Sequence, residues 1–71
     1  MPNYCVNTNA QNNGDHEVHN VDYGACHHLP EPRNRMPLGS HASCAGAVAL
    51  AKRTYPTANG CAYCCAACNT G

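Results

Sequence analysis

The C-terminal segment concentrates four of the seven cysteines of the chain within eight residues. Cys61 and Cys64 form one Cys-x-x-Cys pair, and Cys65 and Cys68 form a second. Two intervening residues let both sulfurs of a pair turn toward one point at a separation of about 3.7 Å, which suits a tetrahedral metal ion better than a disulfide within one turn. The segment therefore predicts a thiolate metal site.

A closed tetrahedral site needs four donors, and we predict Cys61, Cys64, Cys26 and His19. Cys26 is expected where a hairpin ends, in a loop that can turn its sulfur inward. His19 ends a predicted strand. The fourth position stays open to other donors, namely His16, His27, His28, Cys44 and Cys68. For Cys65 and Cys68, ligation, core packing and a disulfide are all left open.

The size of the chain explains why a metal is expected at all. Its 71 residues form one domain, residues 1–71, with no Trp and no Phe. A core this small supplies about 3–5 kcal/mol of net stability. A structural zinc ion contributes roughly 10–16 kcal/mol that is also folding energy, whereas one disulfide contributes about 2–4 kcal/mol. We therefore predict one structural Zn²⁺, and we expect Arg33, Arg35, Lys52 and Arg53 to be solvated surface charges rather than counterions of its anionic site.

Charge and cysteine content limit the binding partners and the cellular compartment that we expect for the protein. The formal net charge is zero and charged residues are 11% of the chain, which argues against a strong electrostatic attraction to nucleic acid or anionic membrane. The N-terminus lacks the basic and apolar regions of a signal peptide, so we expect a reducing cytoplasm. There, cysteine-rich spacing indicates metal or redox chemistry before a disulfide framework.

The first half of the chain predicts a β-hairpin. Residues 3–9 and 17–21 are expected as strands, with a turn at Asn13-Gly14 between them. Several prolines make regular structure unexpected over residues 29–37. Leu38-Gly39 is expected to begin a short third strand. Cys5 is expected in the core, and His41 is expected to face solvent.

One helix is predicted over residues 44–55, with Ser43 as its N-cap and Pro56 as its terminator. Positions 44, 47, 48, 51 and 55 form an apolar stripe at helical spacing, so Cys44 is expected to pack in the core. A loop over residues 57–60 precedes the cysteine run, which is expected as a turn leading into a short helix. The predicted fold class is α+β, with a small antiparallel sheet packed on one helix and stapled by zinc.

The order of these residues resembles a family of short, uncharacterised bacterial proteins rich in Cys and His. Its members carry Tyr-x-Val-Asn, Asn-Gly-Asp-His-Glu-Val-His, a Cys before His-Leu-Pro, Leu-Gly, a Cys opening an Ala-Val-x-x-Ala-Lys helix, and a final Gly-Cys-x-x-Cys with a third Cys. The match covers nearly the whole chain and is carried by residues 4–7, 13–19, 26–30, 38–39, 44–52, 60–64 and 68. The chain departs from the family in residues 22–24, which lengthen the gap between His19 and Cys26, and at Asn69, where the family has His.

More remotely, the arrangement is similar to the zinc domain of bacterial methylphosphotriester DNA-repair proteins. In that domain a strand delivers two ligands, an Ala-rich helix follows, and a Cys-x-x-Cys closes the site. The likeness implies a mixed α+β fold and hints at contact with DNA, although fold analogy does not carry function.

The resulting functional prediction is a non-catalytic zinc-binding module, a monomer that binds another protein and no membrane. Only four carboxylates are present, and no phosphate-binding loop or catalytic triad order is found. Two alternatives are kept. A nucleic-acid-binding zinc domain would need the four basic residues and the tyrosines on one face. A thiol redox or metal-handling protein would use the C-terminal cysteines, although a thioredoxin-like βαβ unit does not fit this length.

Overall fold

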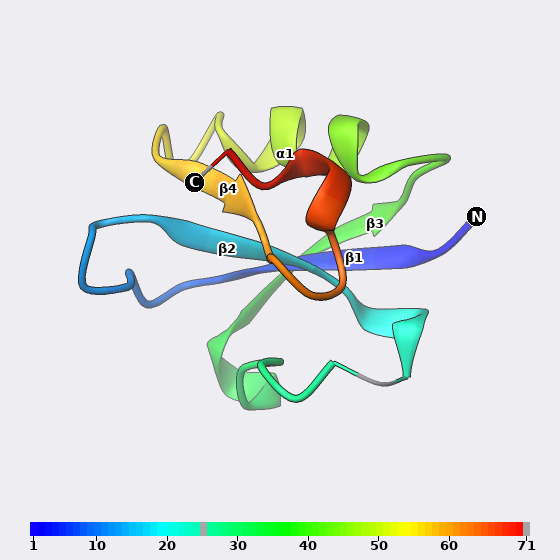
Figure 1. Cartoon of the computed structure of the whole chain (residues 1–71), viewed down its shortest axis with the longest axis horizontal. Helices are drawn as coiled ribbons and strands as arrows, with labels where there is room; N and C mark the ends of the chain where they lie inside the picture. Colours follow the sequence, from blue (N-terminus) through cyan, green and yellow to red (C-terminus); the bar gives the residue numbers. More distant parts are fainter. Residues whose placement is uncertain (25, 71) are drawn as a thin grey trace.

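The computed structural model describes residues 1–24 and 26–70 and has the predicted α+β class. A mixed four-stranded sheet is covered on one face by a single α-helix (Figure 1). The order across the sheet is β3-β1-β2-β4. The strands are β1 Asn3–Asn7, β2 His16–Asn20, β3 Arg35–Ser40 and β4 Ala58–Gly60.

The predicted hairpin is confirmed, since β1 and β2 pair antiparallel. Val6 lies opposite Val18, and Cys5 lies opposite His19. Opposed residues of an antiparallel pair project to the same face, and neighbours along a strand project to opposite faces. The two valines therefore enter the core beneath the helix, whereas Cys5 and His19 belong to the other face. Gly14 adopts φ +90 in the connecting turn, a conformation that glycine reaches without steric cost.

The third strand begins earlier than predicted. A 3-10 turn, η2 (Pro32–Asn34), leads directly into β3, which includes Pro37 and pairs antiparallel with β1. The expectation of irregular structure over residues 29–37 is therefore wrong from Pro32 onward. The order of the sheet supplies the reason, because β3 is an edge strand and proline is tolerated there despite its missing N–H.

Strand β4 was not expected, because its sequence Ala-Asn-Gly has no strand propensity. It pairs parallel to β2, with His16 opposite Ala58 and Val18 opposite Gly60. The pairing exists because the crossover through the helix returns the chain to the free edge of β2 (Figure 1). The sheet is consequently mixed rather than purely antiparallel.

Helix α1 (Cys44–Ala51) packs through the predicted stripe. Ala47 and Ala51 are buried in the core, and Cys44, Val48 and Tyr55 pack against it. The regular helix ends at Ala51 rather than at 55, although the Tyr55 amide still donates to the Ala51 carbonyl at 2.8 Å. Ser43 precedes the helix as predicted but makes no side-chain capping hydrogen bond.

Apart from Tyr4 and Leu38, the core is built from small side chains. The largest that are fully buried are His19, Val6, Val18 and Cys61, so the bulkiest of them is a polar histidine. Burying a polar ring normally requires a partner for its nitrogens. The core alone thus gives little stability, and its composition favours additional stabilisation by a metal ion or a disulfide. No helix in the described part of the chain is long and apolar enough to cross a membrane.

Two features hold the remaining segments in place. On the face opposite α1, the 3-10 turn η1 (Val21–Tyr23) and residues 26–31, which lead to η2, lie across the sheet (Figure 1). On the helix side, a disulfide joins Cys44 to Cys68, which belongs to the 3-10 turn η3 (Ala66–Cys68). Cys44 therefore packs against the core as predicted and is also covalently bonded, which was not expected of it.

Candidate metal centre

The fold brings together the same four residues that the sequence predicted as ligands. The donor atoms of His19, Cys26, Cys61 and Cys64 all lie within 4.8 Å of one another. Cys26 Sγ lies 3.8 Å from both His19 Nδ1 and Cys61 Sγ. Cys64 Sγ lies 3.5 Å from His19 Nδ1. With Zn–S bonds of about 2.3 Å and Zn–N bonds of about 2.0 Å, a tetrahedron separates two sulfurs by about 3.8 Å and a sulfur from a nitrogen by about 3.5 Å. Three of the donor separations are therefore close to those of a tetrahedral metal site, and all of them lie within 4.8 Å.

The donors come from three separate places in the chain. His19 is on β2, Cys26 follows η1, and the Cys61–Cys64 pair follows β4. The Cys61 amide donates to the Val18 carbonyl at 2.9 Å and so extends the β2–β4 pairing by one residue. This bond places the first thiol beside the strand that carries His19. The Cys65 amide then donates to the Cys61 carbonyl at 2.9 Å, closing the turn that brings Cys64 back to the cluster.

Gly60 is required where the turn folds over β4. A Cβ atom at this position would lie 2.7 Å from the Cys65 carbonyl oxygen and 2.8 Å from Cys68 Cβ. Contacts this short with backbone cannot be relieved by rotating a side chain, so only glycine lets the cysteine segment pack so closely. The Gly-Cys-x-x-Cys order thus has a steric basis as well as a chemical one.

Backbone amides point at two of the sulfurs. The Tyr63 amide donates to Cys61 Sγ at 3.5 Å, and the Asn20 amide donates to Cys64 Sγ at 3.4 Å. Hydrogen bonds to a sulfur favour its thiolate form, which is the form that binds metal. The turn and the end of β2 therefore prepare the sulfurs for a cation.

His19 presents Nδ1 to the sulfurs as a neutral imidazole. Burial, followed by the charges of His28 and Arg35, lowers its pKa to about 4. Its Nε2 is buried and, within the described chain, has no hydrogen-bond partner, but Glu17 Oε1 lies 3.7 Å away. An imidazole that carries its proton on Nε2 leaves Nδ1 free to ligate, and a carboxylate near that proton is the usual outer partner of a metal-bound histidine.

The Cys64 thiol stays protonated in the absence of a cation. Burial is the largest cause that raises the pKa of Cys64, and it likewise raises the pKa of Cys65 and of Cys5. A cation bound among the cluster sulfurs would displace their protons, since the thiolate is the ligand. Cys65 is packed in the core cluster and Cys5 lies on β1, so both remain buried free thiols outside the four-donor cluster.

Glu17 was missed by sequence reasoning, although a signal existed. It lies two residues before His19 on a strand, and residues at this spacing share a face. We expect Glu17→Gln to weaken zinc binding by about tenfold, because the amide is a poorer acceptor for the imidazole N–H than a carboxylate. Competition with a chromophoric chelator will measure the change, with Glu31→Gln as the surface control. Equal affinity in the two variants would remove Glu17 from the site.

The other candidate donors lie elsewhere. His16 stacks on Tyr55 with ring centroids 4.0 Å apart and places Nδ1 2.9 Å from the Asn7 carbonyl. His28 stacks on Tyr63 at 4.3 Å, and His27 is exposed. Cys44 and Cys68 are joined to each other. None of these residues belongs to the donor cluster found in the described chain.

One placement outside the cluster differs from expectation. His41 is half-buried rather than solvent-facing, because its Nε2 lies 2.7 Å from the Leu38 carbonyl and its ring meets the edge of Tyr4. Cys5 is buried as predicted, although on the face of the sheet opposite the helix.

Comparisons with family models, with curated proteins and with solved structures find no match to this chain. The resemblance to short Cys/His-rich bacterial proteins therefore stays a prediction. What is known of the site rests on the geometry of the four donors.

Proposed function

We propose that this chain is a small non-catalytic module that folds around one structural Zn²⁺ held by His19, Cys26, Cys61 and Cys64, and that it serves as an interaction domain. The observation that carries the proposal is the tetrahedral spacing of the four donor atoms. Three thiolates and one imidazole form a common donor set for structural zinc. The small core supplies the physical need for the ion.

The site is closed, which favours a structural role for the ion over a catalytic one. A catalytic zinc keeps a coordination position for water or substrate, whereas a structural zinc is enclosed by four protein donors. His19 and Cys61 are each 0% exposed, and Cys26 and Cys64 are partly buried, so it is the four protein donors that would close the coordination sphere. Metal binding at such a site would lock β2, the loop after η1 and the cysteine turn together.

A protein partner fits the surface better than nucleic acid does. Phosphate backbones are bound by several unpaired Lys and Arg side chains on one face. Of the four basic residues, Arg33 pairs with Glu31 at 3.0 Å, and Arg35 is half-buried on the sheet face opposite α1, away from any run of exposed cations. The cations that remain, Lys52 and Arg53, are too few for a strong electrostatic footprint. From the sequence arguments given above, we also propose that the protein is cytoplasmic and monomeric.

Zinc titration of the reduced, metal-free chain tests the proposal. We expect one equivalent to bind at pH 7 and to release about three protons, because three thiols become thiolates. Since protons compete with the ion, the apparent affinity is expected to fall as the pH falls, by up to about a thousandfold per pH unit for three protons. The His19 imidazole binds in its neutral form and adds only a fraction of a proton at pH 7, because an imidazole of ordinary pKa in the unfolded, metal-free chain is already mostly neutral there.

Native mass spectrometry gives the stoichiometry, and a pH indicator gives the protons. Mg²⁺ serves as a control, since a thiolate site does not favour a hard cation. A chain that stays metal-free in excess zinc, or that binds zinc with no proton release, would contradict the proposed site.

A further inference from the structure

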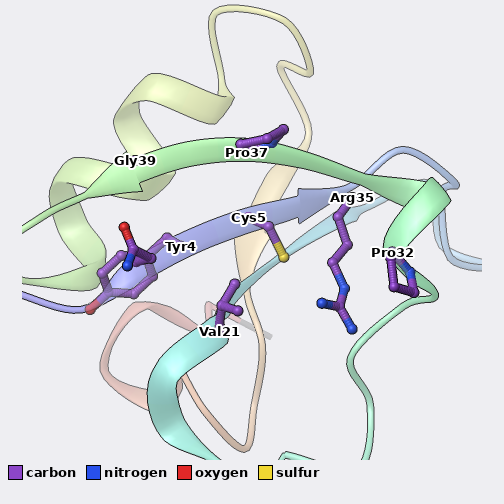
Figure 2. Close-up of a pocket in the computed structure, with 8 residues that line it drawn as sticks. Tyr4, Cys5, Val21, Pro32, Arg35, Pro37 and Gly39 are labelled. Carbon is purple, nitrogen blue, oxygen red and sulfur yellow. The ribbon is translucent and has the colours of Figure 1, made fainter.

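A cavity of about 360 Å³ lies on the sheet face opposite α1, outside the metal cluster. Strands β1 and β3 form its base, and η1 and η2 form its sides. Figure 2 shows Cys5 and Arg35 projecting from the two strands into the same hollow, with Val21 below Cys5 and Pro32 on the far side of Arg35. This volume is within the range of small-ligand sites, which are lined mostly by apolar groups with a few placed polar ones.

Arg35 is the charged group in the lining of this cavity. Its Nε donates to the Pro30 carbonyl at 2.7 Å, which holds the guanidinium in place. Within the described residues the guanidinium forms no ion pair with a carboxylate. A half-buried guanidinium without a counterion has its terminal N–H groups available, and this planar fork matches the two oxygens of a carboxylate.

The remaining lining is apolar or already engaged. Cys5 is 2% exposed and acts as an apolar floor rather than as a nucleophile, since burial raises the pKa of its thiol. Val21 and Pro32 offer hydrocarbon walls. At the end of the cavity near Asn3, the Asp22 carboxylate accepts hydrogen bonds from the Asn3 backbone amide at 2.9 Å and from its side chain at 3.2 Å. The cavity thus combines one cationic group with mainly apolar walls.

We propose that this cavity binds a small organic carboxylate with a short apolar body, its carboxylate paired with Arg35 and its body against Val21 and Pro32. The proposal goes beyond the structural metal site and gives the module a ligand of its own. It needs the folded chain, so the ligand experiment uses protein whose zinc loading has been confirmed by mass spectrometry, and a failure to bind the ligand then leaves the metal site standing.

Benzoate and its neutral isostere benzamide are suitable probes of the zinc-loaded protein. We expect saturable amide shifts with benzoate, confined to residues of β1, β3 and η1 around the cavity. Benzamide, and benzoate with Arg35→Met, are each expected to bind about tenfold or more weakly, because a charge-assisted pair is lost. Arg35→Lys should retain part of the affinity. Arg33→Met, a change at an exposed arginine outside the cavity, should bind benzoate as the wild type does.

The outcomes are distinct. No saturable shift with benzoate, or equal binding of benzoate and benzamide, overturns the proposal. If benzoate fails to bind and Arg35→Met instead weakens zinc binding, Arg35 balances the anionic metal site and the carboxylate site does not exist. Should Arg35→Met fail to fold, the benzoate-to-benzamide comparison on the wild type still decides.

Discussion

Replacing Cys61 by alanine is expected to leave the chain unfolded at neutral pH. The change removes one of four donors and opens a site on which roughly 10–16 kcal/mol of apparent binding energy depends. A typical small domain has a total stability of about 5–15 kcal/mol, so the loss of most of this binding energy is enough to unfold it. Excess chelator added to the wild type should have the same result, reversed by one equivalent of zinc. Dispersion of amide NMR signals measures both.

Cys65→Ala is the matched control for this change. Cys65 lies in the same turn, is 3% exposed and packs in the same core cluster, but it is not among the four donors. We expect it to fold with zinc and to lose about 1 kcal/mol, as for an average core substitution. If Cys61→Ala keeps dispersed signals, or if Cys65→Ala is the variant that unfolds, the donor set is wrong.

Removing the disulfide with Cys44→Ala and Cys68→Ala is expected to cost about 3–4 kcal/mol in the zinc-loaded protein. The bond joins residues 24 apart in sequence, and closing a loop of this length restricts the unfolded chain by about this amount. Urea unfolding of the variant and of the oxidised wild type, both with zinc, measures the difference. The variant should still bind one zinc ion, because neither cysteine belongs to the donor cluster.

Two checks accompany this prediction. The wild type treated with a reductant should become as stable as the double variant. Denatured, metal-free, oxidised protein should show the five free thiols of the structure, and all seven after reduction. Equal stability of variant and oxidised wild type would show that the bond contributes nothing. Because disulfides persist chiefly in oxidising compartments, the state of this pair in cells also tests the predicted cytoplasmic location.

Much of the site follows from local geometry that a sequence contains. The spacing of Cys61 and Cys64 sets the turn between them, whatever the rest of the fold does. The helical stripe that includes Ala47 and Ala51 follows from a period of 3.6 residues, and both are buried as predicted. The hairpin follows from its turn residues and strand pattern.

Other features depend on pairing between distant segments. The strand β4 has no propensity of its own and exists because the edge of β2 is free to accept it. The position of the Glu17 carboxylate near His19 could have been predicted from strand spacing, but only if the boundaries of that strand were known. The cavity at Arg35 forms only where β1, β3 and two 3-10 turns come together, and no local sequence pattern predicts contacts between these distant segments.

Residue types and spacings predicted which atoms this protein offers to a cation, and the small interior led us to expect that the fold needs one. Tertiary structure alone decided that His19, and not another of the five histidines, faces the sulfurs, and that Cys68 bonds to Cys44. The physical reason is that side-chain chemistry and short turns are local properties, whereas the choice among equivalent donors depends on which backbone segments hydrogen-bond to one another across the sheet.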